Sequence, residues 1–228
     1  MKRQALLSMV VLLAVGGGLA QTVYAAPPIP PLASMAVSAL AQRLCDGNAS
    51  VRQAAVLALG EMGPAANATI PDLARVLRDR DRYVAVDAGH ILEKMGPDAV
   101  PSVAAMLFDP NPCVRELAAQ TLRKIGPDAK AAVPALAQRL KDCSASVRQA
   151  SVLALADIGP AAKSAIQDLA QSVRDPDPYI ASDAAHTLGR LGPEVIPSLT
   201  PLLEDRNPAV RERAALTFRQ IGQENVAK

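Results

Sequence analysis

Apolar residues recur along this chain at helical spacing. In residues 51–62 they stand at Val51, Ala55, Ala58, Leu59 and Met62. Offsets of 0, 4, 7, 8 and 11 place these side chains on one face of an α-helix. Gly63 then suits a left-handed C-terminal cap, and the Pro after it stops one helix and can lead into the next. The pattern therefore predicts an amphipathic helix that ends near Gly63.

The same phrase occurs six times, and each copy ends at or near a Gly. The copies are 33, 30, 33, 33 and 30 residues apart and start at Val51, Val84, Val114, Val147, Ile180 and Val210. Between copies, a second apolar segment runs to an Asp, and a short turn of Asp, Asn, Pro or Ser joins it to the next copy. Each repeat is thus predicted to be two helices joined by tight turns.

The repeats also show a second level of order. Residues 39–132 align without gaps on residues 135–228, a shift of 96 positions. Roughly half of the aligned positions are identical, far above chance for internal similarity. A block of three repeats was therefore duplicated, and we expect two halves, 34–129 and 130–228.

The pattern resembles HEAT repeats, in particular the short repeats of phycobilisome-lyase-like proteins. The match lies in the run Asp-Pro-Asn-Pro-Cys-Val-Arg at 109–115, continued by Leu122, Ile125, Gly126 and Pro127. The resemblance implies an all-α fold, a right-handed α-solenoid of about six helix pairs over residues 34–228. It also implies that the inner helices line a concave face, the usual binding surface of such solenoids.

In HEAT repeats the turn Asp and the Arg six residues later typically form a ladder between neighbouring repeats. The second and fifth repeats depart from this pattern, because Ala85 and Ala181 replace the Arg. The resemblance therefore implies a structural ladder with two equivalent interruptions. Its members are Asp46/Arg52, Asp109/Arg115, Asp142/Arg148 and Asp205/Arg211.

Residues 1–25 are typical of a secretory signal peptide. Lys2 and Arg3 precede an apolar stretch, and a small-residue site ends at Ala25. Cleavage after Ala20 is one alternative and an uncleaved membrane anchor is another, although the stretch is short for a span and contains three Gly. We expect a periplasmic or secreted protein that begins near Ala26, with a Pro-rich lead over 26–33.

Charge and composition narrow the function. Removal of residues 1–25 lowers Lys+Arg from 24 to 22, which equals the 22 Asp+Glu, so the mature chain is formally neutral. Nucleic-acid binding needs a basic face and is not expected. No second apolar run is long enough to span a membrane. With only 2% aromatic residues, the core must consist of small aliphatic side chains, which favours closely packed helices.

Motifs of catalysis and metal binding are absent from the sequence. It contains no Gly-rich phosphate loop, no CxxC pair and no HExxH helix, and only two His. Deoxyhypusine hydroxylase, which has HEAT-like repeats, is known for iron-binding His-Glu pairs, but Ile follows His90 and Thr follows His186. We expect a binding protein and not an enzyme, with no cofactor and no metal.

One polar constellation occurs twice. Two sets of a Tyr, an Asp, a His and a basic residue stand at the same places in the second and fifth repeats. Their offsets of 0, 4, 7 and 11 residues from the Tyr put each set in one stripe along its helix, at the border of solvent. Duplication of an ancestral surface accounts for such a pair, and so does a pair of contact points for a partner. The first stripe is Tyr83, Asp87, His90 and Lys94, and the second is Tyr179, Asp183, His186 and Arg190.

Four Leu residues fall away from the core face and favour a binding groove, namely Leu57, Leu117, Leu153 and Leu216. The leading hypothesis is an exported scaffold that binds a protein partner, of unknown identity, through the concave face. The alternatives are a non-catalytic or lyase-like maturation factor for a cofactor-bearing partner, and a structural spacer or assembly subunit.

Three Cys residues are an odd number, so they cannot all pair within one chain. Cys113 and Cys143 fall in the turns of adjacent repeats. A disulfide between them requires those turns to lean together and leaves Cys45 free. Three free thiols are the alternative.

Overall fold

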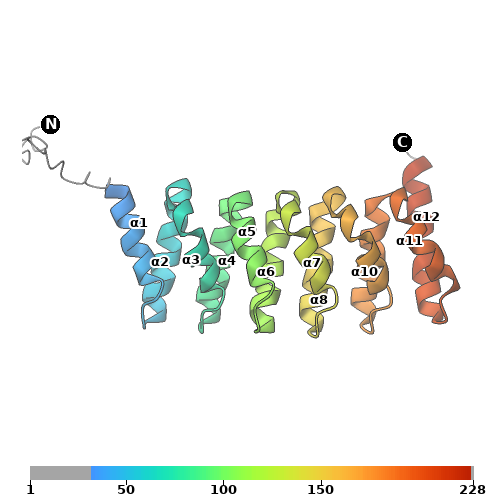
Figure 1. Cartoon of the computed structure of the whole chain (residues 1–228), viewed down its shortest axis with the longest axis horizontal. Helices are drawn as coiled ribbons and strands as arrows, with labels where there is room; N and C mark the ends of the chain where they lie inside the picture. Colours follow the sequence, from blue (N-terminus) through green and yellow to red (C-terminus); the bar gives the residue numbers. More distant parts are fainter. Residues whose placement is uncertain (1–31, 227–228) are drawn as a thin grey trace, which may run out of the picture. The chain divides into compact units, whose positions relative to one another are not determined.

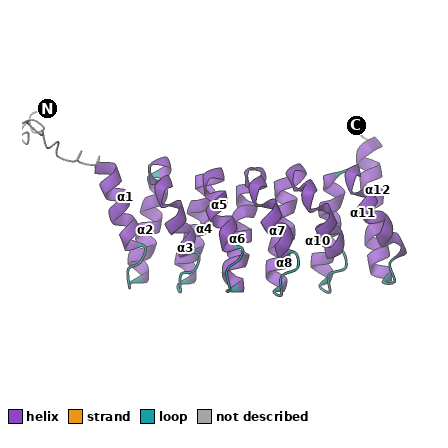
Figure 2. Cartoon of the chain, viewed as in Figure 1, coloured by secondary structure: helices purple, strands orange, loops and turns teal. Residues whose placement is uncertain are grey.

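The computed structural model describes residues 32–226, which form helices joined by short turns, without any strand in that range. The predicted signal peptide and most of the predicted lead lie outside the described residues. The all-α expectation is confirmed, and the helices form six pairs (Figures 1 and 2). The first helices of the pairs are α1 (Leu32–Arg43), α3 (Ile70–Val76), α5 (Val100–Met106), α7 (Val133–Arg139), α9 (Ile166–Ser172) and α11 (Ile196–Leu199).

The second helices are longer and carry the recurring phrase. Each internal one packs on the second helices of the repeats before and after it, and α2 and α12 each pack on one, so together they form a continuous layer. The pairs follow one another in chain order, from α1 to α12 (Figure 1). Packing is most extensive between α6 and α8, where the two halves meet. The second helices are α2 (Ala49–Glu61), α4 (Arg82–Met95), α6 (Pro112–Ile125), α8 (Ala145–Ile158), α10 (Pro178–Leu191) and α12 (Pro208–Val226).

The core alternates large and small side chains along the second helices. One position holds a fully buried Leu in five repeats: Leu59, Leu92, Leu122, Leu155 and Leu188. The position four residues earlier is small in all six repeats and also buried: Ala55, Ala88, Ala118, Ser151, Ala184 and Ala214. Small residues at this point let neighbouring helices approach closely, as the composition predicts.

One further helix position is buried although the sequence pattern did not predict it. Val56, Ala119 and Val152 are completely buried although they lie beside the predicted apolar face. Each internal second helix is flanked on both sides by other second helices, and α2 packs on both α1 and α4, so the buried surface is wider than a single stripe. The buried face that the sequence pattern predicts is therefore narrower than the one in the structure.

The Gly residues after the second helices adopt a conformation different from the predicted one. Gly96 has φ 66° and ψ −138°, and Gly126 has φ 69° and ψ −136°. Positive φ is as expected, but these ψ values lie outside the left-handed helical region, in one that only Gly adopts readily. The chain then enters a 3-10 turn with Pro near its start. Where Pro is missing, after Gly222, helix α12 continues to Val226.

Short 3-10 segments precede or follow the first helices, and the sequence pattern did not predict them. They are η1 (Gly63–Thr69), η2 (Gly96–Ala99), η3 (Gly126–Ala132), η4 (Gly159–Ala165), η5 (Pro193–Val195) and η6 (Thr200–Glu204). Together with the turns, they bring each second helix back beside the previous one, so that equivalent side chains repeat along the layer.

Candidate functional site

A ladder of carboxylates runs along the turns between first and second helices. In each repeat, Oδ1 of the turn Asp accepts a hydrogen bond from the backbone N–H two residues later. The donor–acceptor distances lie between 2.8 and 3.0 Å, and the aspartates are Asp46, Asp79, Asp109, Asp142, Asp175 and Asp205. This contact fixes the turn and holds the carboxylate in place for a cation from the preceding repeat.

The Arg of one repeat binds the Asp of the next. Arg52 donates from Nε to Oδ2 of Asp79 at 2.6 Å and from Nη2 to Oδ1 at 2.7 Å. Its Nη1 donates to the main-chain carbonyl of Asp46 at 2.8 Å. Arg115 binds Asp142, and Arg148 binds Asp175, with the same geometry. In a sequence pair such as Asp46/Arg52, the Arg therefore binds the main-chain carbonyl of the Asp. The carboxylate that the same Arg binds belongs to the Asp of the next repeat.

The expected interruptions of the ladder do not occur. In the two repeats that lack the ladder Arg, another Arg takes its place, namely the residue immediately before the turn Asp. Arg78 binds Asp109 and Arg174 binds Asp205 through Nε. These arginines lie in the turns just after α3 and α9, and each binds the turn Asp of the next repeat. The sequence motif missed them because it considered only the position six residues after the Asp.

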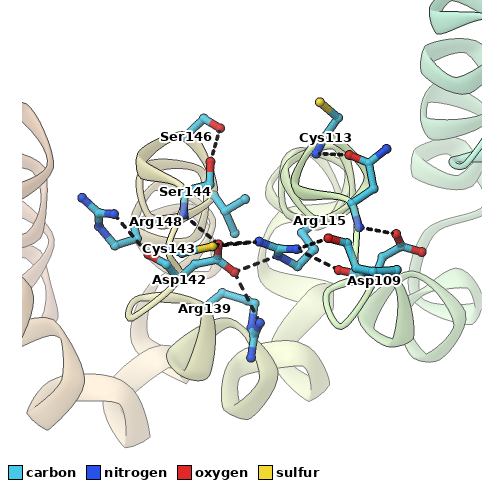
Figure 3. Close-up of polar contacts among 12 residues, drawn as sticks. Asp109, Cys113, Arg115, Arg139, Asp142, Cys143, Ser144, Ser146 and Arg148 are labelled. Atoms are coloured by element: carbon cyan, nitrogen blue, oxygen red, sulfur yellow. Dashed lines mark hydrogen bonds and ion pairs between the residues drawn. The ribbon is translucent and has the colours of Figure 1, made fainter.

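The Arg115–Asp142 pair is the most buried rung and lies at the junction of the two halves (Figure 3). Its side chains are 8% and 2% exposed. Arg139 adds a contact at 3.3 Å to Asp142, and its guanidinium lies 4.9 Å from the centroid of the Phe108 ring. Two cations therefore surround one carboxylate, which keeps the buried negative charge paired.

These contacts shift the titration of the aspartates. The hydrogen bond from Arg52 lowers the pKa of Asp79 and outweighs burial, which acts to raise it. Burial alone would raise the pKa of Asp142, but hydrogen bonds from Arg115 and the Ser144 N–H outweigh it, so this pKa is lowered too. Because the pKa of these aspartates is lowered in the folded state, their contribution to the free energy of unfolding is fully present above the ordinary Asp pKa of about 4. It is lost as the pH falls through the folded value.

The three cysteines are free and exposed. Cys143 Sγ lies 3.7 Å from Nη2 of Arg115, whereas Figure 3 shows the Cys113 sulfur pointing away from this cluster. The structure therefore has no disulfide between these two residues.

The two predicted stripes lie on the surface of α4 and α10, separated along the layer by α6 and α8. Tyr83 and Tyr179 are 78% and 75% exposed. The His and basic members, His90, Lys94, His186 and Arg190, are exposed as well. Asp81 and Asp177 cap the two helices by accepting the main-chain N–H of Tyr83 and Tyr179. The stripes are thus held on rigid helices.

The acidic members of the stripes are half-buried and differ in their contacts. Asp87 accepts a hydrogen bond of 2.7 Å from Nε2 of Gln53 on α2. Asp183 has no such side-chain contact among the described residues, although Gln149 occupies the position equivalent to Gln53. Neither Asp forms a salt bridge among the described residues, so neither belongs to the ladder.

A row of side chains joins the two stripes. The His residues share one helix position with Leu57 and Leu216, which are exposed, and with Leu153, which is half-buried. Leu117 is half-buried at another position. We name this shared position the central row; its members are Leu57, His90, Gln120, Leu153, His186 and Leu216. The Leu and His members were predicted from separate patterns, although they stand at one position of the repeat.

Neither a metal cluster nor a membrane-spanning helix is found within residues 32–226. No three His, Cys, Asp or Glu side chains of that range gather closely enough to hold a metal ion. None of its helices is both long and apolar enough to cross a membrane. What the surface does offer is a repeated set of aromatic, polar and apolar groups on adjacent helices, a chemistry suited to binding.

Family models for HEAT repeats match most of the chain. One, for the HEAT repeat, covers residues 36–66, and another, for HEAT repeats, covers residues 70–156 and 166–228. Among curated proteins no sequence matches.

Several solved structures share the fold. The complex of CpcE and CpcF of phycocyanin lyase from Nostoc sp. PCC7120 is 24% identical, with 92% of this chain and 82% of that chain covered and a TM-score of 0.51. A structure that describes microtubule plus end tracking by XMAP215, CLIP-170 and EB1 is 18% identical. The match covers 80% of this chain and 89% of that chain, with a TM-score of 0.58.

Computationally designed armadillo repeat proteins for modular peptide recognition are 16% identical, with coverage of 81% and 99% and a TM-score of 0.51. At these identities the likenesses establish the fold alone. They agree with the helix-pair stack described above.

Proposed function

Because the chain belongs to the HEAT-repeat family, we propose that it is a protein-binding scaffold whose binding surface is the layer of second helices. Stacked helix pairs of this kind are typical of non-catalytic scaffolds and offer an extended surface for a partner. The observation that carries the proposal is the duplicated stripe. On α4 and α10, two equivalent sets each present an exposed Tyr, an exposed His and an exposed basic residue beside a half-buried Asp.

The chemistry of the stripes suits protein recognition. An exposed Tyr is a rigid, amphipathic anchor that loses little conformational entropy on binding, and such residues dominate many interfaces. The neighbouring charges orient a partner. The exposed Leu57 and Leu216 of the central row add apolar contact area at either end. These groups together favour a partner that runs along the layer.

The spacing of the stripes indicates what kind of partner fits. They lie three repeats apart, which corresponds to roughly 30 Å at about 10 Å for each repeat. An extended or internally repeated protein can contact both points, and the second contact then gains from the high effective concentration created by the first. A face that the resemblance predicts to be concave would hold such a partner along its length.

Substitution of both tyrosines tests this proposal. Tyr83→Ala with Tyr179→Ala should reduce the affinity for the native partner by at least about tenfold, and each single variant should have a smaller effect. Partners are recovered from the native cell envelope by pulldown with the wild-type protein, and affinities are then measured with the identified partner.

The matched control for these variants is Lys130→Ala with Gln171→Ala, two exposed positions outside the second helices. His90→Ala with His186→Ala tests the centre of each stripe in the same way. If folded double variants bind the partner as tightly as the wild type, the stripes are only duplicated surface. A structural spacer or a maturation factor would then be the better hypothesis.

We also propose that the protein acts outside the cytoplasm, in the periplasm or as a secreted protein. The charged start, apolar stretch and small-residue site of residues 1–25 support this. N-terminal sequencing of the native protein should find a start near Ala26. A start at Met1 in a cytosolic fraction would contradict export.

A further inference from the structure

The duplication makes the two ends of the stack complementary to each other. A shift of 96 residues relates α12 to α6, and relates α2 to α8. Helix α6 packs on α8 in the most extensive contact between any two helices of the described chain. The outer side of α12 therefore carries the equivalents of the residues with which α6 contacts α8. The outer side of α2 carries the equivalents of those with which α8 contacts α6.

At the α12 end, apolar side chains are uncovered where their equivalents are buried. Leu203 is 39% exposed, whereas its equivalent Leu107 is completely buried. Ile196 is 38% exposed, whereas its equivalent Val100 is 2% exposed. The last described repeat thus leaves exposed the apolar positions that are buried in the equivalent internal repeat.

The opposite end shows the same difference. Val51, Ala58 and Met62 on and just after α2 are half-buried. Their equivalents around α8, which α6 covers, are at most 1% exposed: Val147, Ala154 and Ile158. Both ends therefore present one side of an apolar interface that exists in complete form in the middle of the chain.

The charges at the two ends match in the same way. Nη1 of Arg211 donates to the main-chain carbonyls of Asp205 and Arg206 at 2.8 and 3.1 Å, as Arg115 does to its own turn. Unlike Arg115, Arg211 contacts no carboxylate among the described residues. At the other end, Asp46 is the equivalent of Asp142, and no Arg side chain of the described range binds its carboxylate.

A second charge pair repeats this relation. Nε of Arg123 on α6 binds Asp157 on α8 at 2.8 Å. The equivalents are Arg219 on α12 and Glu61 on α2, both exposed and without a salt bridge within residues 33–223. Two unpaired cations at one end thus correspond to two unpaired anions at the other.

We propose that copies of the chain associate end to end, with α12 of one copy packed on α2 of a second copy as α6 packs on α8. Arg211 then binds Asp46 of the second copy, and Arg219 binds Glu61 of the second copy. The two surfaces are different, so each added copy leaves one free end of each kind and assembly continues. The proposal does not depend on the proposed function, but the three-repeat spacing of the stripes would continue from copy to copy.

Sedimentation velocity and light scattering of the purified protein test the association between about 1 µM and 1 mM. The expected result is a mass that rises with concentration beyond that of a dimer. Leu203→Asp should weaken the association at least about tenfold, because it places a charge in the apolar contact. A mass that stays at one chain throughout, or a closed dimer that does not grow, would overturn the proposal.

A charge exchange tests the orientation of the copies. Arg219→Glu and Glu61→Arg should each weaken the association, and the chain that carries both should recover it, because opposite charges then face each other again. The matched control is Arg206→Glu, an exposed residue at the same end whose equivalent Pro110 stays exposed beside the internal junction. Circular dichroism checks that each variant is folded. Self-association that is insensitive to Leu203→Asp and to both single charge reversals would contradict the proposed interface.

Discussion

The Arg115→Met variant is expected to lose about 3 kcal/mol of its free energy of unfolding, the lower end of the range for breaking a buried ion pair. Met fills much of the space of the Arg stem, so the main loss is the pair of hydrogen bonds to Asp142. That carboxylate is then left nearly buried with only Arg139, at 3.3 Å, as a cation. Urea unfolding followed by circular dichroism measures the change.

Arg211→Met is the matched control for this result. Arg211 makes the same contacts to its own turn carbonyls as Arg115 but contacts no carboxylate in the described chain. We expect it to change the free energy of unfolding by at most about 1 kcal/mol, as for an exposed charged group. Measurements at dilute concentration keep any self-association out of the comparison. Equal losses in the two variants would show that the link between repeats contributes little.

Ala118→Leu is expected to destabilise the protein by about 1–3 kcal/mol through overpacking. Ala118 is completely buried on α6, a helix that packs on α4 on one side and on α8 on the other. The added side chain has no cavity to enter and must force the helices apart. A lower urea midpoint with an unchanged slope would be the expected measurement.

Gln120→Leu on the same helix provides the control for Ala118→Leu. Gln120 is exposed, so the same Leu should change the free energy of unfolding by no more than about 0.5 kcal/mol. A midpoint unaffected by Ala118→Leu would show that the second helices can separate at no cost. The repeat stack would then be far more compliant than its packing indicates.

The helix pairs were predictable because their signal repeats. One amphipathic phrase is ambiguous, but six copies with Gly at the same place leave little choice of structure. The small residue at Ala118 and its equivalents was also predictable, since a recurrent Ala or Ser within an apolar face marks close helix contact. The burial of Ala119 beside that face was not predictable, because it depends on the second helices that pack on both sides of α6.

The partners in the ladder were harder to predict. The sequence shows an Asp and an Arg six residues apart, but the carboxylate that Arg52 binds lies 27 residues later, in the next repeat. The motif also does not predict that Arg78 takes the place of the missing ladder Arg. Whether this side chain reaches Asp109 of the next repeat depends on the backbone geometry of the turn, which the sequence does not show. The hydrogen bond between Gln53 and Asp87 escaped prediction for the same reason.

The exposure of the stripes followed from the sequence, because position along a helix determines which face a side chain occupies. Tyr83 and Tyr179 lie on the surface as expected. The central row did not emerge from helical periodicity within one repeat. It becomes visible only when the same position is compared across repeats, as Leu57, His90 and Gln120 show.

The replacement of the ladder Arg also records the order of two past events. In the second repeat Arg78 accompanies Ala85, and in the fifth Arg174 accompanies Ala181. One exchange of the Arg position followed by one duplication explains both pairs, whereas the reverse order needs the same two substitutions twice. The block of three repeats had therefore already undergone the exchange when it was duplicated, and both halves inherited a rung built from a different residue.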